Sequence, residues 1–391
     1  MSQEDWDRLQ YYSRKVKAFR VAYDYDPQVH PSTYVRIAQL QPSGLFPSLR
    51  RLSYYLTDIS VSYIYLFLSP LLDSLEFRCI YRFEDIVVGP FLATLSSTPQ
   101  MPRRIVISYG RMPVDVLKKS IVNFKQLRSL ELLVAVSFRD FSLWEVLGTL
   151  PSLENLTLED TYYASASHPR HAPENSSSQS TGLRHFDALE SLHVAGSVFL
   201  IQHLLGFIDS PCLKSIEVSV IRWPEDLLTP FMTIVSSKWS QSLKNLAISL
   251  ISIADLNGIT LRDPTLSRPP SQVYISIPTL RIIAENYPEL RCLVIQLDVS
   301  TIPPFDDIYS KSLRHNLDVL KILDVRGPDT TPQSMLEYQI DVARHLDLIF
   351  PYLKAIEVQD ENWFGICNLR LIKFCEGQRQ RWQRWDNAIF F

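Results

Sequence analysis

The sequence has little glycine, no closely paired cysteines and no long apolar segment. Its 391 residues include 11 glycines, whereas doubly wound nucleotide-binding enzymes need glycines at their phosphate-binding turns. The five cysteines form no C-x-x-C pair, which is typical of reduced thiols inside the cell. The polar start MSQEDWDRLQYYSRK does not resemble a secretory signal, and no apolar run approaches the roughly 18 residues of a membrane span. We therefore expect a cytoplasmic or nuclear protein that does not span a membrane.

The charges and motifs exclude further classes. There are 39 Lys and Arg against 42 Asp and Glu, so the net charge is −3 and gives no reason to expect a nucleic-acid partner. The motifs GxGxxG, GxxxxGK[ST], GxSxG and HExxH do not occur. His168 and His171 lie in a polar stretch without further ligand candidates, so we interpret them as part of a solvated loop. The sequence thus predicts no enzyme, no catalytic residues, no cofactor and no metal site.

A short phrase recurs along the chain: a proline or turn residue, followed by Leu-x-x-Leu-x-aliphatic. Clear copies are PSLRRLSY at 47–54, PLLDSLEF at 70–77, KQLRSLEL at 125–132, PSLENLTL at 151–158, DALESLHV at 187–194, PCLKSIEV at 211–218, QSLKNLAI at 241–248, PELRCLVI at 288–295, DVLKILDV at 318–325 and PYLKAIEV at 351–358. Weaker copies are VKAFRV at 16–21 and PRRIVI at 102–107. Most copies follow one another after about 23 to 36 residues, which is typical of leucine-rich repeats that contain a helix. An all-helical repeat lacks this phrase.

The phrase predicts a strand, because its last Leu-x-aliphatic alternates with period two. The equivalent apolar position falls at Phe19, Leu52, Leu75, Ile105, Leu130, Leu156, Leu192, Ile216, Leu246, Leu293, Leu323 and Ile356. Helical patterns at 197–211, 224–239 and 332–351 lie between the strands. We predict an α/β solenoid, a leucine-rich-repeat horseshoe with parallel strands on its concave face and helices on its convex face.

The expected organisation has three parts. Residues 1–15 form an N-terminal capping helix, and residues 16–361 form an array of about twelve repeats. A disordered insertion is expected near 164–182, where the chain is rich in Ser and His. Residues 362–391 form a C-terminal tail, interpreted either as a cap on the last repeat or as a docking element.

The residue between the two strand apolars should face the concave surface. The candidate protein-binding residues in this row are Glu76, Glu131, Thr157, His193, Glu217, Asp324 and Glu357. A row of carboxylates favours a basic partner. Alternatively, these are ordinary solvent-facing strand residues, neutralised by Arg51, Arg78, Arg104 and Arg326 in neighbouring rows.

The phrases FPSLRRL, LPSLENLTLED, SPCLKSIEV, YPELRCLVIQ and FPYLKAIEV resemble the repeats of fungal F-box/leucine-rich-repeat proteins of the basidiomycete type. The segment DWDRLQYYSRKVKAFRV resembles the part that follows the F-box in that family. The F-box itself, which holds the ligase adaptor, is not recognisable before it. The resemblance implies the substrate-binding part of a cullin-based ubiquitin ligase, which binds a protein marked for degradation. A free-standing leucine-rich-repeat adaptor or sensor fragment without a ligase link is the alternative.

Overall fold

The computed structural model describes residues 3–21, 33, 36–37, 44–56, 61–79, 84–98, 101–108, 114–134, 141–160, 186–220, 228–250, 274–304, 313, 315–326 and 332–358. The chain forms two compact units, Met1–Cys212 and Leu213–Phe391. Each unit combines a parallel sheet with helices, which confirms the α/β class expected from the repeated phrase. None of the described helices is both long and apolar enough to cross a membrane.

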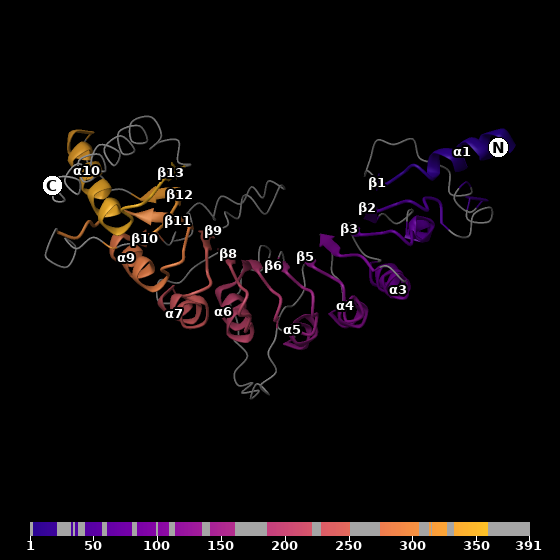
Figure 1. The fold of residues 1–391 in the computed structure, drawn as a ribbon, viewed down its shortest axis with the longest axis horizontal. Coiled ribbons are helices and arrows are strands. Elements are labelled where there is room, and N and C mark those ends of the chain that lie inside the picture. Colours follow the sequence, from indigo (N-terminus) through magenta and orange to yellow (C-terminus); the bar gives the residue numbers. More distant parts are fainter. Residues whose placement is uncertain are drawn as a thin grey trace, which may run out of the picture. The chain divides into compact units, whose positions relative to one another are not determined.

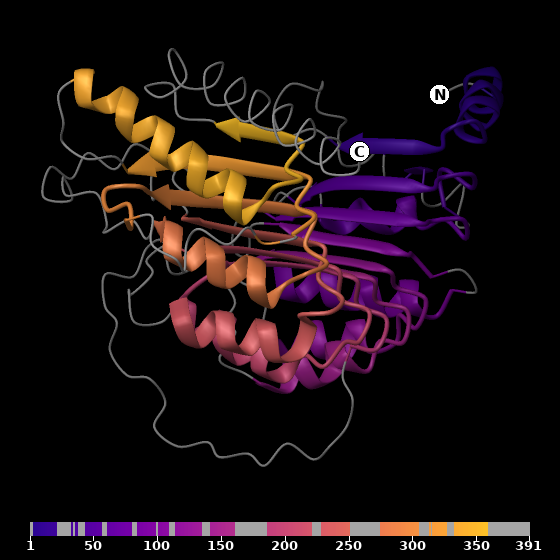
Figure 2. The same ribbon diagram turned by 60° about the vertical axis from the view of Figure 1, so that its left-hand side comes forward.

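Unit 1 contains a parallel sheet whose strands are paired in chain order from β1 to β7. These strands are β1 Ala18–Val21, β2 Arg51–Leu56, β3 Ser74–Cys79, β4 Arg104–Ser108, β5 Ser129–Val134, β6 Asn155–Asp160 and β7 Ser191–Gly196. The helices are α1 Gln3–Ser13, the 3₁₀ helix η1 Val61–Phe67, α3 Glu84–Ser96, α4 Val114–Ile121, α5 Phe141–Gly148 and α6 Val198–Phe207. Figures 1 and 2 show α3, α4 and α5 on one side of this sheet.

Unit 2 repeats the plan with strands paired in the order β8, β9, β11, β12 and β13, and with β10 pairing β11. The strands are β8 Ser215–Val220, β9 Asn245–Leu250, β10 Ile275–Ser276, β11 Cys292–Asp298, β12 Val319–Arg326 and β13 Ala355–Val358. The helices are α7 Leu228–Trp239, α9 Ile277–Asn286 and α10 Pro332–Ile349. The segments expected to be helical at 197–211, 224–239 and 332–351 therefore contain α6, α7 and α10.

The core of unit 1 lies between the sheet and the helices. The predicted strand apolars pair with one another from strand to strand, as Leu130 does with Leu156 and Leu156 with Leu192. These three leucines are at most 1% exposed. Aromatic contacts join the two layers: the Phe77 ring of β3 lies 5.5 Å from the Phe91 ring of α3. One side of each strand is thus committed to the helices, which leaves the alternate side chains on the other side of the sheet.

The backbone fixes the register at the beginning of each strand. In unit 1 the amides of Glu154 and Asn155 both donate to the carbonyl of Arg128, one repeat earlier. In unit 2 Lys354 and Ala355 donate to Asp318 in the same way. Equivalent residues of successive phrases therefore lie beside one another, so a row of equivalent positions in the sequence becomes a row on the sheet.

One predicted position is wrong. Leu323 was expected to align with Ile356, but Ile356 pairs with Leu320. The buried phrase in this repeat is Leu317-x-x-Leu320-x-Ile322, and Leu323 is half-exposed beside an irregularity in the pairing of β11 with β12. The reason is that the chain contains two overlapping matches to the same pattern, and the backbone bond from Asp318 to Arg291 selects the earlier one.

Some expectations concern parts of the chain outside the described residues. These are the insertion near 164–182 and the tail at 362–391. The proposed boundaries at residues 15 and 361 remain predictions.

Candidate protein-interaction surface

The side chains that alternate with the core residues of unit 1 form a grid on the side of the sheet opposite the helices; most are at least partly exposed, and Val106, Ser108 and Ala195 are buried. We call this grid the polar strand face of unit 1. Its first row is Ala18, Arg51, Ser74, Arg104, Ser129, Asn155 and Ser191. Its second row is Arg20, Ser53, Glu76, Val106, Glu131, Thr157 and His193. Its third row is Tyr55, Arg78, Ser108, Leu133, Glu159 and Ala195.

The structure brings four of the predicted residues together in the second row. Glu76, Glu131, Thr157 and His193 lie on strands β3, β5, β6 and β7, and all four are partly exposed. Their neighbours in chain order, such as Leu130 and Leu156, are buried. The row therefore faces outward as the period-two pattern predicts, and it is held in place by a paired backbone.

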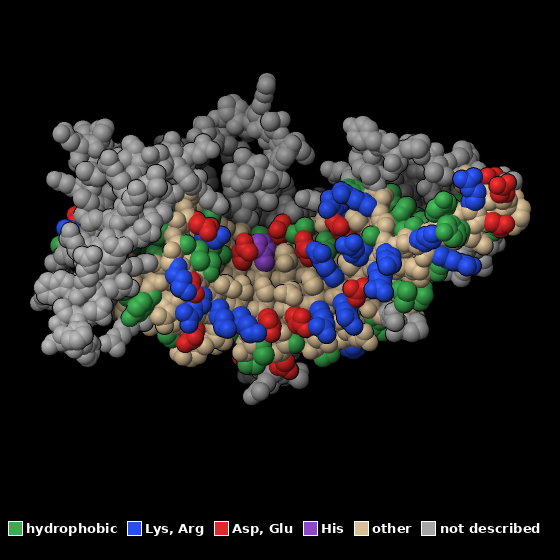
Figure 3. Space-filling view, turned by 45° about the horizontal axis from the view of Figure 1, so that its top comes forward, with side chains coloured by type: hydrophobic (Ala, Val, Ile, Leu, Met, Phe, Trp, Pro, Cys, Tyr) green, Lys and Arg blue, Asp and Glu red, His purple; other side chains and the backbone are tan. Residues whose placement is uncertain are grey.

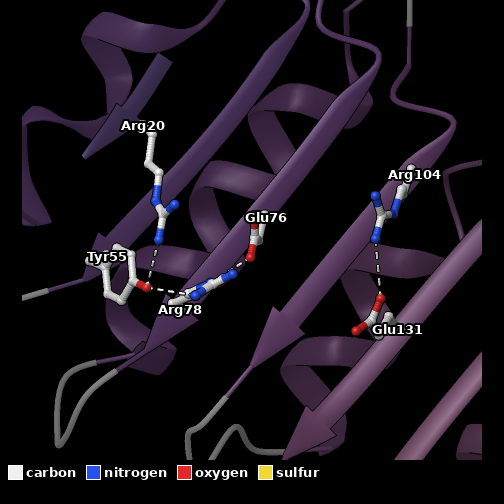
Figure 4. Close-up of polar contacts among 6 residues, drawn as sticks. All are labelled: Arg20, Tyr55, Glu76, Arg78, Arg104 and Glu131. Carbon is white, nitrogen blue, oxygen red and sulfur yellow. Dashed lines mark hydrogen bonds and ion pairs between the residues drawn. The ribbon is translucent and has the colours of Figure 1, made fainter. Parts of the chain in front are cut away.

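The acidic members of this row are neutralised by arginines. The Glu131 carboxylate lies 3.3 Å from the Arg104 guanidinium on the neighbouring strand (Figure 4). Glu76 accepts a hydrogen bond of 2.5 Å from Nε of Arg78, two residues further along β3. The sequence predicts Arg78 and Arg104 as neutralising residues, and the ion pairs confirm this for both. The row does not act as an isolated line of negative charge.

Arg78 also connects Glu76 to an aromatic residue that the sequence analysis did not single out. Its Nη1 donates to the Tyr55 hydroxyl at 2.6 Å, and Nη2 of Arg20 approaches the same oxygen at 3.4 Å. Figure 4 shows the two guanidinium groups pointing at this oxygen from different strands. Arg20, Tyr55, Arg78 and Glu76 thus form one continuous polar cluster across β1, β2 and β3.

This cluster shifts the ionisation of its members. Burial alone would raise the pKa of Tyr55, but the hydrogen bonds and charges of Arg20 and Arg78 outweigh it and lower that pKa. Burial likewise opposes ionisation of Glu76, yet the hydrogen bond and charge of Arg78 bring its pKa below the ordinary value. The hydrogen bond to Glu76 is the largest influence that raises the pKa of Arg78. The cluster therefore remains charged near neutral pH.

At the other edge of the face the charges are sparser. Nε2 of His193 lies 3.6 Å from the Glu159 carboxylate, across β7 and β6. Thr157 lies between Glu131 and His193 in the second row. This part of the surface offers hydroxyl, imidazole and carboxylate groups in a small area.

Two of the three predicted residues of unit 2 lie in one row, because Glu217, Ala247, Val294, Lys321 and Glu357 are successive register partners; Asp324 lies outside this row. Glu217 lies on β8 and is exposed. Glu357 of β13 pairs in register with Lys321, whose ammonium lies 2.8 Å from its carboxylate. Asp324 lies elsewhere on β12, in register with Gln296, and accepts a hydrogen bond of 2.6 Å from the Tyr274 hydroxyl. Asp324 lies outside the predicted row because the prediction aligned Leu323 with Ile356, whereas Leu320 occupies that position in the structure.

The described residues contain no group of three or more His, Cys, Asp or Glu arranged to hold a metal ion. Cys292, on β11, is partly buried, and burial raises the pKa of its thiol. A thiol with a raised pKa is a weak nucleophile. The side chain of Arg326 lies outside the described residues.

Comparison with known proteins gives no assignment: no protein-family model matches the chain, and no curated protein is significantly similar to it.

Proposed function

We propose that the chain is a non-catalytic leucine-rich-repeat module that binds another protein through its strand surface. The supporting observations are the repeated phrase, the strand that begins within each copy, and the rows of buried apolar residues that these strands contribute in each unit. In such a solenoid the strands line the concave side and the helices the convex side.

The polar strand face of unit 1 is the observation on which the proposal depends. It presents guanidinium, carboxylate, hydroxyl and imidazole groups on paired strands, so each group is held at a fixed position relative to its neighbours. Surfaces rich in arginine and tyrosine are favoured in protein interfaces, because these side chains combine contact area with directional hydrogen bonds. Arg20, Tyr55 and Arg78 supply both residue types in one cluster.

The resemblance to fungal F-box/leucine-rich-repeat repeats suggests which process the module serves. On this proposal it is the substrate-binding part of a cullin-based ubiquitin ligase subunit, located in the cytoplasm or nucleus. A free-standing adaptor or sensor with the same binding surface is the second candidate. The recurrence of Leu-x-x-Leu-x-aliphatic favours the repeat class for both, and the ligase link rests on the resemblance alone.

The test compares two substitutions that add the same side chain on opposite sides of the sheet. Thr157→Arg places a guanidinium on the polar strand face, and Glu145→Arg places one on the exposed surface of α5. Affinity purification of the tagged chain with quantitative mass spectrometry should show partners that are lost with Thr157→Arg and retained with Glu145→Arg. Equal retention of all partners by both variants would contradict the proposed surface. Cullin-ligase components among the partners would favour the ligase over the adaptor.

A further inference from the structure

The positive charge on unit 1 is unevenly balanced. Four arginines on or directly before β3, β4 and β5 each lie within 4 Å of one carboxylate. These pairs are Arg78 with Glu76, Arg103 with Asp73, Arg104 with Glu131 and Arg128 with Glu154. Each arginine of this region is thus matched by an acid of the same sheet.

The first two strands are different. Lys17, Arg20, Arg50 and Arg51 are exposed, and in the part of the chain that the structure describes none has a carboxylate within ion-pair distance. The four residues are close in the fold, since the amides of Arg50 and Arg51 both donate to the carbonyl of Lys17. Arg20 lies on β1 opposite Ser53 of β2, two residues beyond Arg51. We call these four residues the β1–β2 basic patch. Figure 3 shows Lys and Arg side chains gathered next to the N-terminal helix.

Arg20 is also held in position. Its guanidinium lies 5.9 Å from the centre of the Tyr55 ring as well as near the Tyr55 hydroxyl. A neutral phenol leaves the positive charge of the guanidinium uncompensated, whereas a paired carboxylate offsets it with a negative charge nearby.

We propose that the β1–β2 basic patch binds an acidic polypeptide segment, which the proposed recognition function would use as part of its target. This inference rests on the proposed function, and the partner has the opposite charge from the basic partner considered in the sequence analysis. A carboxylate near Arg20 and Arg51 would form new ion pairs without displacing existing ones. Such complementarity accelerates association and selects partners by charge.

The observations favour a polypeptide over a nucleic acid. The arginines on or directly before β3, β4 and β5 are each matched by a carboxylate, so a run of phosphates longer than the patch would find no further unmatched arginine there. The whole chain is also slightly acidic, with a net charge of −3. An acidic segment of a protein can place a few carboxylates on the patch and uncharged residues beyond it.

The experiment measures binding of a fluorescein-labelled peptide of about eight glutamates to the full chain by fluorescence anisotropy. Arg20→Gln combined with Arg51→Gln should weaken binding on the order of tenfold, because two unmatched cations are removed. The control is Arg103→Gln combined with Arg128→Gln, which removes the same charge from matched positions and should change the affinity less than about twofold. Raising the salt from about 50 mM to about 500 mM should weaken binding to the parent and shrink the difference. Circular dichroism melts check that both variants remain folded.

Three results would overturn the inference. The first is that the peptide does not bind the parent chain, and the second is that both double variants lose the same affinity for it. The third is that an oligothymidylate of the same charge binds more tightly than the peptide and depends on Arg20 and Arg51, which would assign the patch to nucleic acid. The Thr157→Arg experiment remains separate from this one. If the peptide fails while Thr157→Arg still loses partners, the patch is wrong and the binding surface stands. If Thr157→Arg retains every partner, the proposed function fails whatever the peptide does.

Discussion

Replacement of one buried leucine and its outward neighbour tests the division of each strand into two faces. Leu156 lies in the middle of unit 1, paired with Leu130 and Leu192, and is 1% exposed. Leu156→Ala removes three carbon atoms, worth about 2.4 kcal/mol at about 0.8 kcal/mol each. The remaining cavity raises the total to about 3–4 kcal/mol, because close-packed neighbours relax only in part. Thr157→Ala, one residue later, removes an outward side chain and should cost less than about 1 kcal/mol.

The assay is urea denaturation of the parent and both variants, followed by circular dichroism. The free energy of unfolding is compared at a common slope with urea, since a changed slope would mean that the exposed surface or the cooperativity has changed. The curves are fitted with two transitions where one does not suffice, because repeat proteins and chains with two compact units need not unfold in one step. Similar losses from the two substitutions, or a larger loss from Thr157→Ala, would refute the assignment of the two faces.

Two further predictions concern the helices and the pH dependence of stability. A Cβ added at Gly89 of α3 would lie 2.5 Å from Cγ1 of Val116 in α4, so Gly89→Ala should destabilise by about 1–3 kcal/mol in chemical denaturation. In a Val116→Ala background the same change should become neutral or stabilising by up to about 1 kcal/mol, and persistence of the loss there would exclude this contact as its cause. Burial lowers the pKa of His315 and His345 below the ordinary 6.5 in the folded protein. The folded state therefore favours the neutral imidazoles, and this contribution to the free energy of unfolding is complete above pH 6.5 and is lost as the pH falls through the folded-state pKa values. Denaturation at about pH 7.5 and about pH 5.5 should show this loss, and His315→Gln, which retains a donor for the Tyr287 carbonyl, should reduce it; an unchanged pH dependence would argue against His315.

Much of the fold was predictable because the repeated phrase determines both periodicity and burial. Leu-x-aliphatic places two apolar residues on one side of a strand, and the recurrence of the phrase places the strands beside one another. The pairings from Phe19 to Leu192 in unit 1 agree with the alignment made from the sequence. Where the phrase was ambiguous, the prediction failed: Leu317-x-x-Leu320 and Leu320-x-x-Leu323 satisfy the same template.

The candidate site was predictable in position but not in charge. The period-two rule was enough to place Glu76, Glu131, Thr157 and His193 on the outward side of their strands. The contacts of long arginine side chains were beyond it, because an arginine can reach a carboxylate on its own strand or on the next one. Arg78 turns to Glu76 on its own strand, and Arg104 reaches across to Glu131. Tyr55 was missed although it lies two residues after Ser53, which pairs with Glu76 in the second row.

The distribution of ion pairs also determines where a charged partner gains binding energy. A partner carboxylate that approaches Arg104 has to compete with Glu131, so one exposed ion pair is exchanged for another and little is gained. A partner carboxylate that approaches Arg51 forms an ion pair where none existed among the described residues. The matched arginines on or directly before β3, β4 and β5 therefore add little net attraction for an acidic partner, and the unmatched cations of the β1–β2 basic patch provide it. A count of acids along one row could not show this, because the charge of a sheet surface depends on which residues of neighbouring rows and strands are already paired.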